Sequence, residues 1–148
     1  MELKHFIGID VSKGTLDIAL VGEGKLRRHL QIANTEKEIK ASVSRLLKEF
    51  GVSLDEAVFC MEYTGIYNKP VLKWLEAQRA RIWLESAVQI SKSSGMTRGK
   101  NDKIDSERIA MYAFINRHKV KTWTAPRLIL QRLALLLSQR NRLMKAKN

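Results

Sequence analysis

The chain has 148 residues, of which 45% are apolar and 28% charged, and its 27 Lys and Arg against 15 Asp and Glu give a net charge of +12. With only 2 Pro and 8 Gly, this composition is typical of a folded domain and excludes a largely disordered chain. No apolar run approaches the ~18 residues of a membrane span, the first ten residues lack a secretory signal, and the single Cys60 excludes an internal disulfide, so we expect a cytoplasmic protein.

The positive charge is concentrated in the second part of the sequence. Residues 1–91 contain 13 basic and 12 acidic side chains, whereas residues 92–148 contain 14 basic and 3 acidic ones. Such an excess indicates a polyanionic partner, most often nucleic acid. A solubilising surface and an acidic protein partner are the alternatives.

The first third of the chain is predicted to form three antiparallel strands. Apolar residues run over 6–11, alternate with other residues over 16–22, and return over 26–32. Short turns that contain glycine separate the three segments, which is typical of a meander. A helix follows, because Thr35 and Glu38 form a capping box before apolar residues at helical spacing, and Gly51 ends it.

The middle of the chain alternates strands and helices. Residues 57–61 are apolar without interruption, which predicts a central, parallel strand that ends at Glu62. A second helix has Pro70 in its first turn, and Tyr67 is a candidate for its buried face. Residues 81–84 are predicted to form a short strand.

The last third is predicted to be helical after a loop. Residues 91–101 are polar, basic and rich in Gly and Ser, so we expect a loop there. Helices are expected over 102–117 and from Pro126 to Asn148. The element order is therefore β-β-β-α-β-α-β, a loop and two helices. By analogy this is the order of the ribonuclease H-like fold, an α/β fold with a mixed sheet and flanking helices.

The final predicted helix carries a heptad pattern. Apolar or long side chains step by four and three residues, which is the spacing of a coiled-coil seam; they are Ile129, Leu133, Leu136, Arg140 and Leu143. We expect this helix to form a homo-oligomer, a dimer or larger. The alternatives are that the chain is an N-terminal piece of a longer protein, or that the helix packs on its own domain.

Four acidic residues are candidates for a metal site. Asp10 lies inside an apolar strand, Glu62 ends another, and Asp102 and Asp105 stand three apart at the start of a predicted helix, where both would point to one side. Oxygen-only ligands favour Mg²⁺ or Mn²⁺ over zinc, and such clusters support phosphodiester chemistry. Each acid also has a structural alternative: a helix cap or helix-dipole partner, an exposed strand end, or an ion pair between Asp10 and Lys13.

Polar and basic residues near these acids are candidates for binding nucleic acid. They follow the candidate carboxylates in sequence or lie in the predicted loop, where they could neutralise phosphates or bring the backbone close to them. The candidates are Lys13, Thr64, Arg98, Lys100, Lys103 and Arg108.

Three sequence motifs resemble those of one family. Residues 7–13, IGIDVSK, with Leu16 and Asp17, resemble the opening of the DEDD-type transposases of the insertion-sequence one-ten family, which includes pilin-gene-inverting recombinases. Residues 62–67, EYTGIY, resemble its E-x-T-G-x-Y motif, and residues 100–110 resemble its K-x-D-x-x-D motif, with Ser106 where the family often has Ala.

The resemblance implies a RuvC-like catalytic domain over residues 1–120 and the start of a coiled-coil helix over 121–148. It implies a tetrad of Asp10, Glu62, Asp102 and Asp105 that holds divalent metal for DNA cleavage and strand transfer. It also implies a bacterial or archaeal source, a structured guide RNA as partner, and a second domain with a nucleophilic serine that this chain lacks. The isolated domain is therefore expected to be inactive in complete recombination.

Two other functions are alternatives. A nucleic-acid-binding module without catalysis agrees with the basic second part of the chain. The sequence Gly8-Ile9-Asp10 followed by a hairpin also resembles the phosphate-binding strands of actin-like ATPases and sugar kinases. Those proteins need further phosphate and adenosine loops, which the sequence does not contain.

Overall fold

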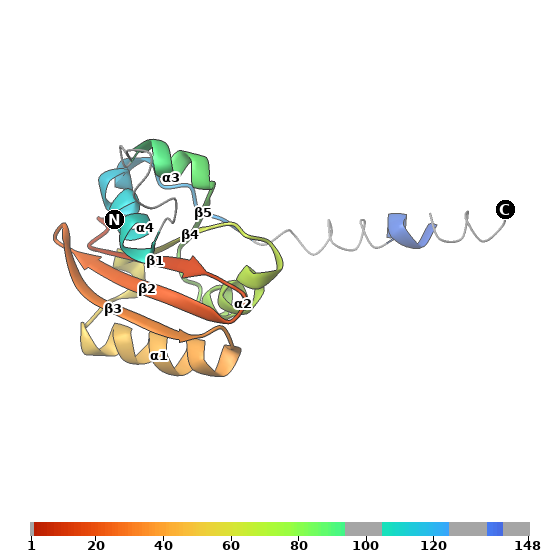
Figure 1. Ribbon diagram of the computed structural model, residues 1–148, viewed down its shortest axis with the longest axis horizontal. Helices are drawn as coiled ribbons and strands as arrows, with labels where there is room; N and C mark the ends of the chain where they lie inside the picture. The colour runs from red at the N-terminus through yellow and green to blue at the C-terminus, as the bar shows by residue number, and fades with distance from the viewer. Residues whose placement is uncertain (1, 94–104, 125–135, 141–148) are drawn as a thin grey trace.

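The computed structural model describes residues 2–93, 105–124 and 136–140 (Figure 1). Its strands are β1 (His5–Val11), β2 (Thr15–Gly22), β3 (Lys25–Ala33), β4 (Ala57–Glu62) and β5 (Ile82–Glu85). Its helices are α1 (Glu36–Glu49), α2 (Lys69–Ala77), α3 (Ala87–Ser93) and α4 (Ser106–Ile115). Short 3₁₀ turns are η1 (Leu54–Glu56), η2 (Ile66–Asn68) and η3 (Arg117–Lys119).

The five strands form one mixed sheet in the order β3-β2-β1-β4-β5. The predicted meander is confirmed, because β1 pairs antiparallel with β2, and β2 pairs antiparallel with β3. Glu23 and Gly24 join β2 to β3 with φ angles of 56° and 74°, a two-residue turn whose twist matches that of the strands. The predicted parallel strand is also confirmed, because β4 lies parallel to both β1 and β5.

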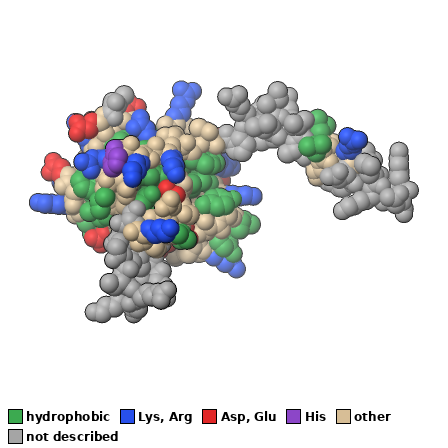
Figure 2. Space-filling view, turned by 90° about the horizontal axis from the view of Figure 1, so that it is seen from above, with side chains coloured by type: hydrophobic (Ala, Val, Ile, Leu, Met, Phe, Trp, Pro, Cys, Tyr) green, Lys and Arg blue, Asp and Glu red, His purple; other side chains and the backbone are tan. Residues whose placement is uncertain are grey.

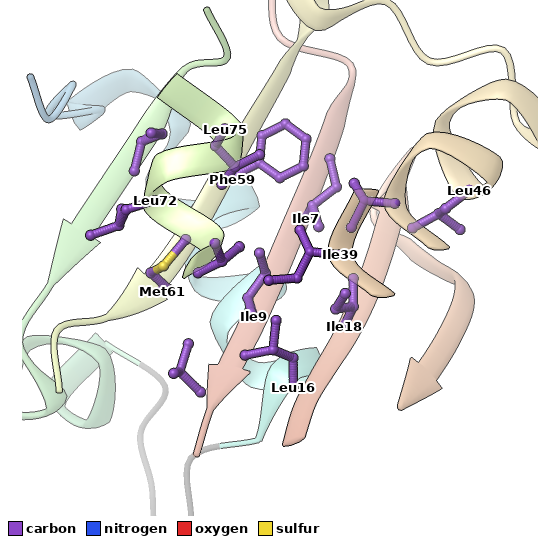
Figure 3. Close-up of a cluster of buried hydrophobic side chains, with 14 of the residues drawn as sticks. Ile7, Ile9, Leu16, Ile18, Ile39, Leu46, Phe59, Met61, Leu72 and Leu75 are labelled. Carbon is purple, nitrogen blue, oxygen red and sulfur yellow. The ribbon is translucent and has the colours of Figure 1, made fainter. Parts of the chain in front are cut away.

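Helices cover both faces of the sheet. One face packs on α1 and α2 through a cluster that includes Ile9, Ile39, Met61 and Leu75, and Figure 3 shows these side chains between the sheet and the two helices. The other face packs on α3 and α4 through a second cluster, which includes Trp83 and Ile109. The strand residues therefore alternate between two buried layers, so an acidic side chain on β1 or β4 enters a layer that helices cover.

Two predicted boundaries were wrong. Residues 91–93, which were expected to begin a loop, are helical and belong to α3. The Ser86 hydroxyl caps this helix by accepting from the backbone N–H of Gln89 (3.2 Å). The helix expected over 102–117 has α4 as its described part, which begins at Ser106 after the N-cap residue Asp105. Asp105 is thus a helix cap in extended conformation and does not lie within a helical turn.

Three further predictions concern Tyr67, the final helix and a membrane span. Tyr67, a candidate for the buried face of the second helix, lies in η2 and is 39% exposed. Of the final predicted helix, residues 136–140 are described and are helical, with Leu136 and Leu137 exposed. The rest of the heptad pattern lies outside the described residues. Within the described ranges, no helix is long and apolar enough to cross a membrane.

Candidate active site

The strand register brings acidic residues to one level of the sheet. Asp10 of β1 pairs with Asp17 of β2, and Glu62 of β4 pairs with Glu85 of β5. Ile9 pairs with Met61 between the parallel strands β1 and β4, so Asp10 and Glu62 are the next residues along each strand. We call Asp17, Asp10, Glu62 and Glu85, which lie on four neighbouring strands, the acidic row.

All members of the acidic row point to the face covered by α4. Ile9 and Met61 belong to the cluster under α1 and α2, and successive side chains of a strand point to opposite faces. The same alternation applies to Asp17, which lies between Leu16 and Ile18, and to Glu85, which follows Leu84. Because neighbouring strands are about 4.8 Å apart, Asp10 and Glu62 are spaced to share a ligand.

Gly8 places the start of α4 beside the acidic row. A side chain at position 8 would collide with the carbonyl oxygen of Ser106 and the backbone nitrogen of Ala110. The first turns of α4 therefore lie directly on β1, two residues before Asp10 and on the same face. Asp105 precedes Ser106, and its carboxylate accepts a hydrogen bond from the backbone N–H of Arg108 (2.9 Å).

Asp102 lies outside the described residues, so the structure describes three of the four predicted acids. Asp10 and Glu62 are partly buried and Asp105 is exposed. Within the described ranges, no three His, Cys, Asp or Glu side chains are arranged as a metal site. The donor set is nevertheless made of carboxylate oxygens, which are the ligands that Mg²⁺ and Mn²⁺ prefer.

Two asparagines, which the sequence did not single out, fix the loops around the acidic row. Asn68 is fully buried; its Oδ1 accepts from the backbone N–H and the hydroxyl of Thr64 (both 2.7 Å), and its Nδ2 donates to the carbonyl oxygen of Glu62 (3.1 Å). Asn34 donates from Nδ2 to the carbonyl oxygens of Ser12 (2.8 Å) and Tyr67 (3.0 Å). These bonds join the turn after β1 to the turn after β4, so both loops are held at the same end of the sheet.

The candidate nucleic-acid contacts divide between described and other residues. Lys13 is exposed in the turn after β1, and Thr64 is held by Asn68 in the turn after Glu62. Arg108 lies in the first turn of α4 and is partly exposed. Arg98, Lys100 and Lys103 lie outside the described residues. Figure 2, seen from the side of α3 and α4, shows Lys and Arg side chains on this face.

Glu85 and Asp17 lie beside the candidate acids, although no sequence motif singled them out. Glu85 Oε2 accepts from the Tyr112 hydroxyl (3.0 Å) and from Trp83 Nε1 (3.2 Å). Burial, and then the hydrogen bond and negative charge of Glu85, raise the pKa of the Tyr112 phenol. The Asp17 carboxylate lies 3.5 Å from Nε2 of His29 on β3. The signal that could have identified Glu85 is its position, since it ends β5 as Glu62 ends β4.

Comparisons with known proteins give the family and the fold. A family model described as a transposase, of the DEDD type of insertion-sequence one-ten elements, matches residues 7–148. The fold is similar to that of RuvC from Thermus thermophilus, with 16% identity, a TM-score of 0.56, and coverage of 78% of this chain and 97% of that one. It is also similar to T. thermophilus RuvC in complex with a Holliday junction substrate, with 16% identity, a TM-score of 0.54, and coverage of 79% and 98%. No curated protein matches the chain. The two structures confirm the predicted ribonuclease H-like fold.

Proposed function

Because the family model covers nearly the whole sequence, the chain belongs to the DEDD transposases of the insertion-sequence one-ten family, and we propose that it is the part of a recombinase that cuts DNA strands with the help of divalent metal. The observation that carries this proposal is the convergence of Asp10, Glu62 and the start of α4 at one end of the sheet. The similarity to RuvC, which was solved with a Holliday junction, supports a DNA substrate.

We propose Asp10, Glu62, Asp102 and Asp105 as the ligands of Mg²⁺ or Mn²⁺. Asp10 and Glu62 lie on β1 and β4, which are inner strands of the sheet with a paired strand on each side. Asp105 is the N-cap of α4, and Gly8 allows this helix to lie close to the sheet. When bound, the metal would stabilise the charge that develops on the phosphate and activate the attacking oxygen.

The remaining groups of the chain bind and orient the DNA in this proposal. Lys13, Thr64 and Arg108 surround the end of the sheet where the acidic row lies, and Arg98, Lys100 and Lys103 precede α4 in sequence. Their charges and hydrogen-bond donors suit phosphate oxygens. We further propose a structured guide RNA and further copies of this chain as partners.

Metal-dependent cleavage of branched DNA by the recombinase tests the proposal. Asp10→Asn and Glu62→Gln should each abolish cleavage while the fold persists, because each removes a ligand charge. Neither variant should lower the melting temperature, because the acidic row holds like charges on neighbouring strands. A clear fall in melting temperature would instead indicate a structural ion pair.

Asp55→Asn is the matched control. Asp55 is exposed in η1, before the start of β4 and therefore at the opposite end of this strand from Glu62. It should leave cleavage unchanged. If the wild type and Asp55→Asn bind DNA but neither cuts it, the chain is a nucleic-acid-binding module without catalysis. If Asp10→Asn cuts DNA as well as Asp55→Asn does, Asp10 is not a metal ligand of the cutting site.

A further inference from the structure

Glu85 lies beside the proposed metal ligands but has a different environment. It pairs with Glu62 across the parallel strands β4 and β5, and both side chains point toward α4. Glu85 Oε2 accepts hydrogen bonds from Tyr112 and Trp83, and Oε1 accepts from the backbone N–H of Ser86 (3.1 Å). Three donors therefore hold this carboxylate in one orientation.

The Glu62 carboxylate differs from that of Glu85 in this respect. Among the described residues, the hydrogen bond to Glu62 comes from Asn68 and goes to the backbone carbonyl oxygen, not to the side chain. The Glu62 oxygens thus remain available for a cation, whereas the Glu85 oxygens are already used. The two neighbouring acids are suited to different tasks.

The hydrogen bond from Tyr112 connects Glu85 to α4. This helix packs on β1, β2 and β4, and its first turns are fixed over Gly8. Tyr112 follows Asp105 by about two helical turns and reaches across to the end of β5, where its ring also contacts that of Trp83 at a centroid distance of 5.3 Å. Contacts at two separated points fix the direction of a helix axis as well as its position.

We propose, on the basis of the proposed function, that Glu85 is a positioning residue that acts through Tyr112 to orient α4 and thereby to place Asp105 against Asp10 and Glu62. The carboxylate of Glu85 does not ligate the metal. It holds the helix whose N-cap supplies a ligand. Because Asp105 lies at the N-terminal end of α4, a small rotation of the helix moves its carboxylate away from Asp10 and Glu62.

Local metal binding by this chain provides the test. Isotope-labelled protein is titrated with Mn²⁺, and the paramagnetic broadening of the Val11 and Tyr63 amide resonances, which neighbour Asp10 and Glu62, reports on the site. Tyr112→Phe removes one hydroxyl and should raise the half-maximal Mn²⁺ concentration about tenfold, which is the size of effect that groups orienting metal ligands from outside the site have. The melting temperature of each variant checks that the fold persists.

Glu85→Gln separates positioning from ligation. The single amide oxygen can still accept from Tyr112 and Trp83, so the shift should be smaller than that of Tyr112→Phe. Tyr63→Phe is the matched control, because it removes the hydroxyl of a phenol that is 62% exposed, and it should change nothing.

Three results would contradict the two proposals in different ways. The proposed metal site itself fails if Mn²⁺ does not broaden these resonances in the wild type, or if it broadens them equally in Asp10→Asn. If that site exists but Tyr112→Phe binds Mn²⁺ as wild type does, Glu85 does not act through Tyr112. If Glu85→Gln loses binding as completely as Asp10→Asn does, Glu85 is a ligand and not a positioning residue.

Discussion

Gly8 is the residue on which the approach of α4 to the sheet depends. A methyl group there would overlap the backbone of Ser106 and Ala110, and neither backbone atom can move without shifting the helix. Gly8→Ala should therefore lower the free energy of unfolding by about 1–3 kcal/mol, as overpacking of a core does. Urea denaturation measures the change.

Gly14 provides the control for this substitution. A side chain at position 14 meets no atom within 4 Å, so Gly14→Ala should leave the unfolding midpoint nearly unchanged. Equal effects of the two substitutions would show that α4 does not rest on β1 as described.

The buried Cys60 thiol and Tyr112 phenol have raised pKa values, and this makes the folded state less stable at alkaline pH. Burial raises the pKa of the Cys60 thiol and of the Tyr112 phenol, and the nearby Glu85 carboxylate raises both further. The folded state therefore favours the neutral forms, whose ordinary pKa values are about 8.5 for the thiol and 10 for the phenol. The contribution of these two groups to stability should be constant below about pH 8.5 and should fall as the pH rises above it, because the unfolded chain then releases protons first.

Thermal unfolding at a series of pH values checks this expectation. Tyr112→Phe removes one of the two groups, so its melting temperature should decline less steeply above about pH 10 than that of wild type. Parallel curves for the two proteins would contradict the role given to the phenol.

At the scale of elements, the strands and the first helix were predictable because local chemistry determines them. Thr35 accepts from the backbone N–H of Glu38 (3.3 Å), as the capping box predicted. The uninterrupted apolar run before Glu62 correctly indicated a central parallel strand. Helix α3 was missed, and its last three residues were assigned to the polar loop, although Ser86 and Gln89 carry the spacing of a second capping box. The start of α4 was placed too early because Asp105 is a cap.

Self-association through the final helix is the prediction that belongs to this scale. Leu136 and Leu137 are 61% and 53% exposed, and an exposed apolar helix favours a second copy as its partner. Replacing Leu133 and Leu136 with Glu should convert an oligomer to a monomer without changing the melting of the core domain. Sedimentation at tens of micromolar measures this, and a monomeric wild-type protein would contradict it.

At the scale of the whole molecule, the site could be predicted only in part. Asp10 and Glu62 are neighbours because each follows a residue pair of two adjacent parallel strands, and the apolar pattern indicated a parallel strand before Glu62. The inclusion of Asp17 and Glu85 in one row depends on strand register, and register is set by tertiary packing that a single sequence does not display. The hydrogen bonds of Asn68 and Asn34 likewise join segments far apart in the chain.

The uneven charge of the chain leads to a prediction about salt. Residues 92–148 carry 14 basic and 3 acidic side chains, so we expect them to bind DNA or RNA with little sequence preference. If about five of them contact phosphates, the log–log dependence of duplex affinity on salt should have a slope near −4 to −5. Replacing Arg98 and Lys100 with Ala should make the slope shallower by about two, equally for all sequences.

Titrations with random-sequence DNA and with structured RNA at two salt concentrations measure this. Absence of binding at about 0.1 M salt would indicate that the charge only maintains solubility. A melting temperature that responds to ATP and not to an oligonucleotide would favour the ATPase alternative.

The acidic row includes both an antiparallel strand pair, β1 with β2, and a parallel one, β1 with β4, and this affects the order in which the protein folds. The pairing of Asp10 with Asp17 requires only the closure of a short turn. Glu62 reaches Asp10 only after the long intervening segment, which includes β3 and α1, has brought β4 back beside β1. Long-range parallel pairing is the slow part of folding, since its loop must close before any contact rewards it. A newly made chain would therefore form its hairpins before the acidic row is complete, and any activity that depends on the acidic row would begin only after the last strands have docked.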